Sequence, residues 1–463
     1  MELLKPREMT PEEAAVFGKL WGQVVAHTRR NMLRSDYHNS KKRLERVGFS
    51  VPPHMVDFQT PIGWAEKTVT VPAARVRPDG YTSSVKSGLS RELDEITGTD
   101  AHRALERQWT RSAMQHGVSF AFVTPNDDPE GEPIRTLRPA SKATATVDPR
   151  TGEVTAALEM VSTTQTLMYL PGLTLRVERV RGPWMVLDEY VGIKDLVPCS
   201  VLPWDASLER PMGRSRITRP LMGFIDNGVR TMLRQEVQAE FFSAPQRSLL
   251  GAQPEHFQDD QGNKIDPLKA LIGGIWALPD VFDEDEQKLV RPAIQQLQQA
   301  SMQPHSDMLR TIAAMVSSET TMPLAYLGVV HDNPSSADAI LASESDMVAM
   351  IENELPSIGA ARVDYARKIL AVKHGELTPA MSKDLTSLRA GFRDPGTPTL
   401  AARADAGQKY VSTFPDGDPE VAMEVYGLRP DQIERNLAHA RKVDASSAID
   451  ALLAATTQPS GGA

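Results

Sequence analysis

The sequence predicts an α+β fold, in which a strand-rich block is followed by long helices. Three observations support this fold class. Strand-like segments gather between residues 118 and 193, long helical patterns occupy much of the range 211–374, and Pro and Gly residues separate the two kinds of pattern. At 463 residues, the chain has the length of about three domains.

The N-terminal part is predicted to be mainly helical. Residues 10–47 form the first helix, opened by Glu12 and Glu13 and ended at Gly48. Periodicity does not decide between helix and strand for residues 62–76. Residues 101–116 have the pattern of an amphipathic helix, and its inward positions are Leu105, Trp109 and Met114.

Four strands are then expected, because short apolar stretches alternate in part with polar residues. They are "VSFAFVTP" (118–125), "EVTAALEMV" (153–161), "TLRVERV" (174–180) and "WMVLDEYVGI" (184–193). The sequence Arg181-Gly182-Pro183 separates the last two and is typical of a hairpin loop.

Two further long helices are predicted around a small β region. The first follows Pro211 and ends before Pro245, and the second runs from Pro292 to Ser318. Between them, "QRSLLGA" and "IGGIWALPD" are strand-like and enclose a polar stretch. Two helices that flank a compact β piece form a stalk with a tip. Because a two-helix stalk cannot bury all its sides alone, this order favours a closed ring of subunits.

Residues 334–374 are predicted to form one very long helix with a bend. Asn333-Pro334 is a start signal, and Gly375 is a stop signal. The apolar face consists of Ile340, Met347, Ile351, Leu355, Ile358, Tyr365, Ile369 and Val372. Pro356 costs roughly 3 kcal/mol inside a straight helix, so we expect a kink there. The alternative is a helix that ends at Leu355 and a second that begins after Gly359.

Composition restricts the class of protein. The net charge of −9 argues against a protein that grips DNA by releasing counterions, although it allows one that surrounds DNA without holding it. The single Cys199 excludes an internal disulfide and is expected to be a small core residue. Neither a membrane span nor a secretory signal is predicted, and the C-terminal "TQPSGGA" is expected to be disordered.

Motifs for catalysis are lacking: no glycine-rich phosphate loop, metal-binding His pair or nucleophile elbow is present. Two acidic stretches could hold a divalent ion, residues 126–132 and the run Asp283, Glu284, Asp285 and Glu286. Both lack regular ligand spacing and are better interpreted as solvated loops. A basic run carries Arg210, Arg214, Arg216 and Arg219. It could touch a phosphate backbone, but contacts between subunits are the favoured interpretation.

Several segments resemble tailed-phage portal proteins, especially those of long-tailed actinobacterial phages. They are "NMLRSDYHNSKKRL", "IGWAEKTV", "PMGRSRIT" leading into "LRQEVQAEFFSAPQRSLLGA", and "NPSSADAILASESDMV". The matches are scattered from about residue 31 to residue 375, and the tail matches nothing distinctive. Met212 stands where such proteins often have an aromatic residue, a change that affects packing.

The resemblance implies a portal-type subunit of a twelve-fold ring. Its expected parts are a mixed α/β wing (1–210), stem helix one (211–243), a clip (244–292), stem helix two (293–318), a tunnel loop (319–333), a long kinked wing helix (334–375), and a helical crown with a disordered tail (376–463). The kinked helix would follow the curved ring wall. The stem basic residues would be those of the run from Arg210 to Arg219.

The resemblance also implies a role and partners. The ring would be the conduit for double-stranded DNA at one capsid vertex of the virion, during packaging, retention and ejection. It would dock the terminase motor, the head-completion or adaptor protein and the major capsid protein, without enzyme activity, cofactor or membrane. The tunnel-loop residues would be Met322, Pro323, Leu324, Tyr326, Gly328, Val329 and His331. Alternatives are another phage structural protein, such as a capsid or tail component, and a hydrolase with dispersed carboxylates.

Overall fold

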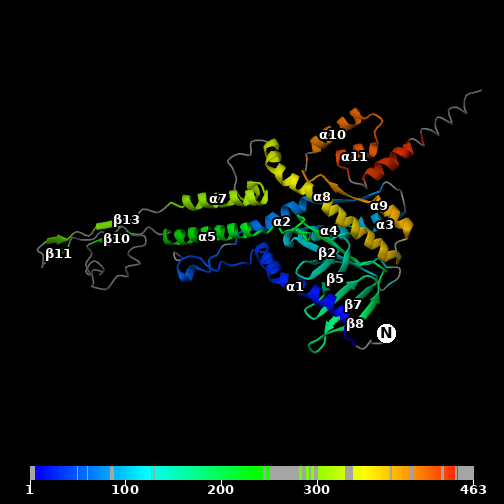
Figure 1. Ribbon diagram of the computed structural model, residues 1–463. Coiled ribbons are helices and arrows are strands. Elements are labelled where there is room, and N and C mark those ends of the chain that lie inside the picture. The colour runs from blue at the N-terminus through cyan, green and yellow to red at the C-terminus, as the bar shows by residue number, and fades with distance from the viewer. Residues whose placement is uncertain are drawn as a thin grey trace, which may run out of the picture. The chain divides into compact units, whose positions relative to one another are not determined.

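The protein is described here as a computed structural model (Figure 1). The structure describes residues 6–446 except 49–50, 60, 84–87, 127, 129–130, 243–246, 251–280, 284–287, 291–292, 297–300, 329–336, 376–377, 397, 399, 429–431 and 444–445. The chain divides into two compact units. The first unit comprises Met1–Ser35, Lys67–Ile217 and Asp332–Ala463, and the second comprises Asp36–Glu66 and Thr218–His331.

Two of the antiparallel sheets in the first unit share a core. The larger sheet has the strand order β4-β5-β6-β7-β8, and its strands are β4 (Ala143–Val147), β5 (Val154–Met160), β6 (Gln165–Leu170), β7 (Leu173–Arg179) and β8 (Trp184–Val191). The smaller sheet has the order β3-β2-β9, with β2 (Val118–Thr124), β3 (Ile134–Pro139) and β9 (Cys199–Pro203). The fold class is therefore α+β, as the sequence predicts.

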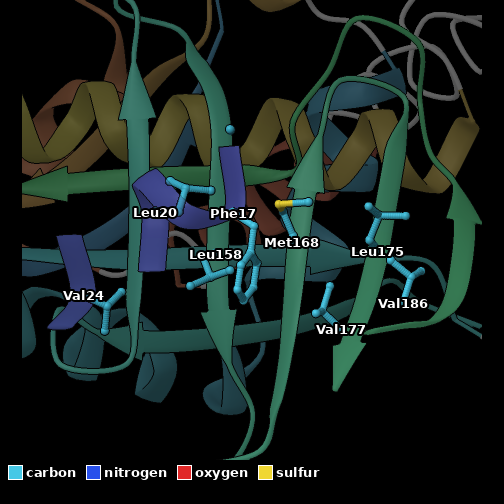
Figure 2. Close-up of a cluster of buried hydrophobic side chains, with 9 residues drawn as sticks. Phe17, Leu20, Val24, Leu158, Met168, Leu175, Val177 and Val186 are labelled. Carbon is cyan, nitrogen blue, oxygen red and sulfur yellow. The ribbon is translucent and has the colours of Figure 1, made fainter. Parts of the chain in front are cut away.

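Alternation along the strands separates two cores on the larger sheet. On one face, Leu158 and Met168 pack against Phe17 of α1 (Pro11–His38), as Figure 2 shows. On the other face, their neighbours Ala157 and Tyr169 pack in a cluster with residues of the smaller sheet, including Phe122 and Cys199. Successive side chains of a strand point to opposite faces, so one stretch of sequence can supply both cores. Cys199 is fully buried, which confirms it as a core residue.

The other elements of the first unit complete it around these sheets. They are α2 (Trp64–Arg75) from Lys67 onward, β1 (Arg77–Thr82), α3 (Gly88–Thr97), α4 (Asp100–His116), α8 (Ala337–His374), α9 (Pro379–Thr386), β14 (Arg389–Arg393), α10 (Leu400–Thr413), α11 (Pro419–Tyr426) and a helical stretch at 432–443. α4 packs on β2 and α8 on β9. A third core joins α8 to α3, α9, β1 and the residues around them.

The second unit is built around two long helices (Figure 1). Its elements are η1 (Pro53–Met55), α5 (Arg219–Phe242), β10 (Arg247–Leu250), β11 (Val281–Asp283), β12 (Lys288–Val290), β13 (Ala293–Gln296), α7 (Gln303–Thr320) and η3 (Leu324–Leu327). β10 pairs with β13, and β11 pairs with β12, both antiparallel.

Most N-terminal expectations are confirmed, with shifted ends. The first helix stops at His38 rather than at residue 47, and the ambiguous stretch 62–76 is helical as α2. α4 begins after Thr99, whose side chain accepts a hydrogen bond from the His102 amide, and ends at Gly117 with φ +99°. Trp109 and Met114 are buried, whereas Leu105 is only half-buried. The four expected strands exist, and the β7–β8 hairpin turns at Arg181 and Gly182 with positive φ.

Candidate functional site

α5 and α7, the paired helices, pack side by side in opposite directions (Figure 1). The Thr218 hydroxyl, just before α5, donates to the Glu319 carboxylate near the end of α7 at 2.7 Å. At the other end, the Gln238 side chain donates to the Ser301 carbonyl. Each of the two helices buries apolar side chains, and Leu233 and Val237 of α5 pack with Val51 and Met55. The buried apolar residues are Leu221, Ile225, Val229, Leu233 and Val237 on α5, and Ile312, Ala313 and Val316 on α7.

Both predicted starts of the paired helices are wrong. α5 begins at Arg219, not after Pro211, because the Thr218 hydroxyl accepts the amide of Leu221 and so acts as a helix cap. α7 begins at Gln303, not at Pro292, because residues 293–296 are the strand β13. The Gln-rich sequence there is typical of a helix, but pairing with β10 determines its structure. "IGGIWALPD" lies outside the described residues.

From the sequence, the two helices are expected to expose apolar residues such as Leu221, Phe224, Met232, Leu297 and Leu309, and fewer of them are exposed in the structure. Leu221 is fully buried, and Phe224, Met232 and Leu309 are half-buried; Leu297 lies outside the described residues. The exposed apolar side chains of these helices include Phe241, Met308 and Met315. Met308 and Met315 are therefore exposed apolar positions at which another molecule could pack.

A glycine lets a tryptophan lie against α5. A Cβ atom on Gly228 would come within 2.8 Å of Ile62 Cδ1 and 3.1 Å of a Trp64 ring carbon. The Trp64 indole donates to the Leu327 carbonyl at 3.1 Å, which fixes the segment after α7. All four residues belong to the second unit.

The residues expected to form a tunnel loop are mostly packed within that unit. Met322, Pro323 and Leu327 are buried, Leu324 and Tyr326 are half-buried, and Gly328 is exposed with φ +85°. The residues from Leu324 to Leu327 form the short helix η3. Val329 and His331 lie outside the described residues. The buried residues stabilise this segment by packing. Only the half-buried and exposed residues can contact other molecules.

α8 is one helix that continues through Pro356, so the alternative of two separate helices is wrong. Pro356 removes the donor for the Glu352 carbonyl. Both residues lie on the exposed side of α8, where water can hydrate that carbonyl. Gly375 ends the helix with φ +78°. The bend at Pro356 stays a prediction.

The predicted apolar stripe of α8 is largely confirmed. Its buried members are Met347, Ile351, Ile358, Tyr365 and Ile369. Leu355 and Val372 are half-buried, and Ile340 is 47% exposed, so the stripe begins later than the sequence suggests. Asn333-Pro334 lies outside the described residues.

A buried ion pair fastens α8 to α4. Arg362 Nε lies 2.8 Å from Glu106 Oε1 and Nη2 lies 3.2 Å from Oε2. Glu106 Oε1 also lies 3.4 Å from His102 Nε2. The guanidinium of Arg362 stacks over the rings of Tyr81 and Phe392 and donates to the Gly391 carbonyl. Burial opposes ionisation of Glu106, but the His102 hydrogen bond and the Arg362 charge outweigh it and lower its pKa.

Sequence reasoning missed this ion pair, because its partners are 256 positions apart. The available signal is local. Arg362 interrupts the apolar stripe of α8, and Glu106 lies on the same face of α4 as Trp109. A charge on a buried face requires a partner, although its identity cannot be derived from periodicity.

The basic run is divided by the structure. Arg210, Arg214 and Arg219 are exposed. Arg216 is buried, donates through Nε to the Thr68 carbonyl at 2.7 Å, and has a pKa lowered to about 10 by burial. Arg216 therefore holds the chain before α5 in place, whereas the other three can meet a partner.

The acidic stretches are only partly described. Asp283 ends β11, and Glu284, Asp285 and Glu286 lie outside the described residues. In the other stretch, the Asn126 amide donates to the Glu132 carbonyl, and the Glu132 carboxylate pairs with Arg135. Within the described ranges, no group of three or more Cys, His, Asp or Glu side chains has metal-binding geometry. None of the described helices is long and apolar enough to cross a membrane.

These features define a class: an α+β protein with paired antiparallel helices and one 38-residue helix fastened by a buried ion pair. No protein-family model matches the chain. Two curated proteins are similar to it. A portal protein of Mycobacterium phage L5 is 27% identical over 388 residues, which cover 81% of this chain and 77% of that protein. A portal protein of Mycobacterium phage D29 is 28% identical over 393 residues, with coverages of 81% and 78%. These matches confirm the resemblance to actinobacterial phage portal proteins.

Solved structures with a similar arrangement come from gene transfer agent particles. The neck of an empty particle, computed with C6 symmetry, gives a TM-score of 0.47 at 11% identity, over 83% of this chain and 92% of that chain. The neck of a native particle, computed with C12 symmetry, gives 0.44 at 12% identity, over 88% and 99%. With TM-scores below 0.5, these structures add no weight to the assignment, which depends on the two phage proteins.

Proposed function

We propose that this chain is a subunit of a phage portal, a ring through which double-stranded DNA enters and leaves the virion head. The observation that carries the proposal is the similarity to two phage portal proteins over 81% of the chain. The paired helices and the 38-residue α8 fit the two-helix stem and the long wing helix that such a subunit requires. The subunit would be made in the host cytoplasm and act at the capsid portal vertex.

The proposed parts keep the order expected from the sequence, and their limits are adjusted to the described helices. The stem would consist of α5 and α7, and the clip would therefore extend from residue 243 to residue 302 instead of ending at 292. The wing would comprise residues 1–210 together with α8, and the crown would comprise residues 376–463. Residues 321–333, after the end of α7, would remain the tunnel loop.

A ring is the assembly that this subunit would form, with twelve copies expected. Phe241, Met308 and Met315 are exposed apolar residues of the paired helices, and contact with a neighbouring subunit would remove them from water. The terminase motor, the adaptor protein and the major capsid protein would dock on such a ring. Energy for packaging would come from the motor, without catalysis by this chain.

DNA would pass through the ring without tight binding. Duplex DNA carries one charge per about 1.7 Å of axis, so a strongly basic channel would hold it. A chain with 60 acidic and 51 basic side chains fits a channel through which DNA slides. In the tunnel loop, Leu324, Tyr326 and Gly328 would face the channel, since the other described members are buried.

Electron microscopy of the purified full-length protein tests the proposal. A ring of subunits with a central hole is the expected result, and labelled protein should occupy one vertex of phage heads. Closed shells or stacked tubes would identify a capsid or tail component instead. Dispersed monomers, together with phage heads that lack the protein, would contradict any structural role and return attention to the hydrolase alternative.

A further inference from the structure

A group of positive side chains lies in the first unit. It involves the C-terminal half of α1 and the turn at residues 207–210. His27, Arg30 and Arg34 occupy positions i, i+3 and i+7 of α1 and so share one side of that helix. Arg210 belongs to the turn after β9. All four residues lie within the first unit. The Trp204 amide, just before this turn, donates to the Gly117 carbonyl at 2.9 Å, next to the His116 carbonyl that Arg34 contacts.

Contacts with the backbone hold the Arg34 side chain and the turn that carries Arg210. Arg34 Nη1 donates to the His116 carbonyl at the end of α4, at 2.7 Å. The turn is closed by paired backbone hydrogen bonds between Ser207 and Arg210 (3.2 and 2.9 Å) and is fastened by the Arg214 amide, which donates to the Trp204 carbonyl at 2.7 Å. The arginines are therefore presented by a helix and by a held turn.

The charges at this place repel one another. Burial, with Arg30 and Arg210 as charged neighbours, lowers the pKa of Arg34 to about 10. Burial, with Arg30 and Arg34 as neighbours, also lowers the pKa of His27. Among the described residues, none forms an ion pair with Arg30, Arg34 or Arg210. This includes Glu209, which precedes Arg210 in the same turn. A half-buried cation among cations is stabilised by an anion that arrives from outside.

The neighbouring surface favours a protein partner over nucleic acid. Leu208, in the same turn as Arg210, is 103% exposed, and Pro211 next to Arg210 is exposed as well. A phosphate backbone offers nothing apolar to such side chains, whereas arginine beside apolar residues is typical of protein interfaces. The chain itself is a source of carboxylates, since its net charge is −9.

We propose that Arg30, Arg34, Leu208 and Arg210, here called the arginine patch, receive carboxylate side chains of a second copy of this chain. The proposal rests on the portal function, in which each subunit meets its neighbour through two different surfaces. A contact of this heterologous kind lets a basic surface on one copy pair with an acidic surface on the next, all around a closed ring. The patch then determines how neighbouring copies are oriented as well as how tightly they bind.

Charge reversal of the two exposed arginines tests the proposal in the full-length protein. Arg30→Glu with Arg210→Glu leaves the Arg34–His116 contact in place. Arg150→Glu with Lys194→Glu is the matched control, because it makes the same change in charge at exposed positions of the same unit. Sedimentation velocity over a range of concentrations measures assembly. We expect the patch variant to need at least tenfold more protein than the control for half-maximal ring formation.

The remaining outcomes separate the two proposals. Rings that form equally well in the patch variant and the control overturn the patch and leave the portal function standing. A wild-type chain that stays monomeric at every concentration and is missing from phage heads overturns both. If the patch variant forms normal rings but binds a fluorescent DNA duplex more weakly, the patch binds nucleic acid. This result also overturns the proposal.

Discussion

Gly213 shows how closely two loops of the first unit approach each other. Its φ is +75°, and an added Cβ would lie 2.4 Å from the carbonyl oxygens of Gly117 and Trp204. Only a residue without a side chain fits between these carbonyls. Gly117 also caps α4, so the position of Gly213 depends on where that helix ends. A single residue thus links a helix end, a strand end and the turn that carries Arg210.

We expect Gly213→Ala to destabilise the protein strongly. Gly152→Ala is the control, since Gly152 has nearly the same φ, +77°, and open space around its Cβ position. Both variants bear the strain of a left-handed conformation, roughly 1–3 kcal/mol. Gly213→Ala should exceed the control by about 2 kcal/mol or more in urea unfolding, because of the additional overlap. Equal losses would show that the loops can separate at little cost.

The buried pair of Glu106 and Arg362 makes a prediction about pH. The pKa of Glu106 is lowered in the folded protein, so its ionised form contributes stability above the ordinary glutamate pKa. That contribution is lost as pH falls from about 4.3 through the lower folded pKa. At neutral pH, Arg362→Met should cost roughly 3–5 kcal/mol, because it leaves a buried carboxylate without its cation.

Unfolding by urea at several pH values measures this coupling. The stability difference between wild type and Arg362→Met should shrink on acidification, since protonated Glu106 no longer needs the guanidinium. Arg103→Met is the control, because Arg103 pairs with Asp100 on the surface. A difference that stays constant from pH 7 to pH 3 would show that the cost comes from lost packing.

α8 connects distant parts of the first unit's sequence. It packs on β9 and β14 and contributes Arg362 to the ion pair with α4. Lys368, near its C-terminal end, donates to the Cys199 carbonyl at 2.6 Å and pairs with Asp364 at 2.7 Å. Pro356 lies between the N-terminal half of α8 and this heavily anchored half. A bend there would redirect one half without disturbing the contacts of the other.

Pro356→Ala is expected to stabilise the isolated subunit and to impair ring assembly. Alanine restores the helix donor that proline lacks, and proline costs up to about 3 kcal/mol inside a helix. A straighter helix should then fit the ring less well. Thermal unfolding of the subunit and sedimentation of the ring measure the two effects. Asn353→Ala, one turn earlier on the exposed side, is the control. If Pro356→Ala gives normal rings and full heads, the bend is not needed for assembly.

At the scale of the whole molecule, the chain combines two separately packed units. Among the described residues, the first contains three antiparallel sheets, one of them the pair of β1 and β14, together with three hydrophobic clusters and α8. The second contains the paired helices and the segment after them. The second unit has a small core of its own around Val51, Met55, Leu233 and Val237. In the proposed ring, the second unit would supply the stem, the clip and the tunnel loop.

Tyr326→Lys tests the tunnel loop. Tyr326 is half-buried at the surface of η3, next to exposed Ala325, so a longer charged side chain can reach solvent there. A ring of added cations would attract the DNA backbone and should slow its passage or alter its retention, while the subunits still assemble. The measurement is the DNA content of particles made with the variant, and Tyr326→Phe is the uncharged control. Full and stable particles with Tyr326→Lys would place this residue away from the DNA.

The sequence by itself determined the local elements. Alternation predicted β2, β5, β7 and β8, helical spacing predicted α4 and α8, and Gly375 marked a helix end, because these signals come from neighbouring residues. Motif resemblance predicted the portal relatives.

Only the tertiary structure decided between helix and strand, or between buried and exposed, where the local sequence pointed the other way. Residues 293–296 are a strand because β10 pairs with them, although their composition favours a helix. Met322 and Leu327 are buried because α7 and Trp64 pack near them, although they follow a long helix in a stretch predicted as a loop. The Glu106–Arg362 pair and the arginine patch join residues far apart in the chain. Such contacts depend on the positions of whole elements, which no window of neighbouring residues contains.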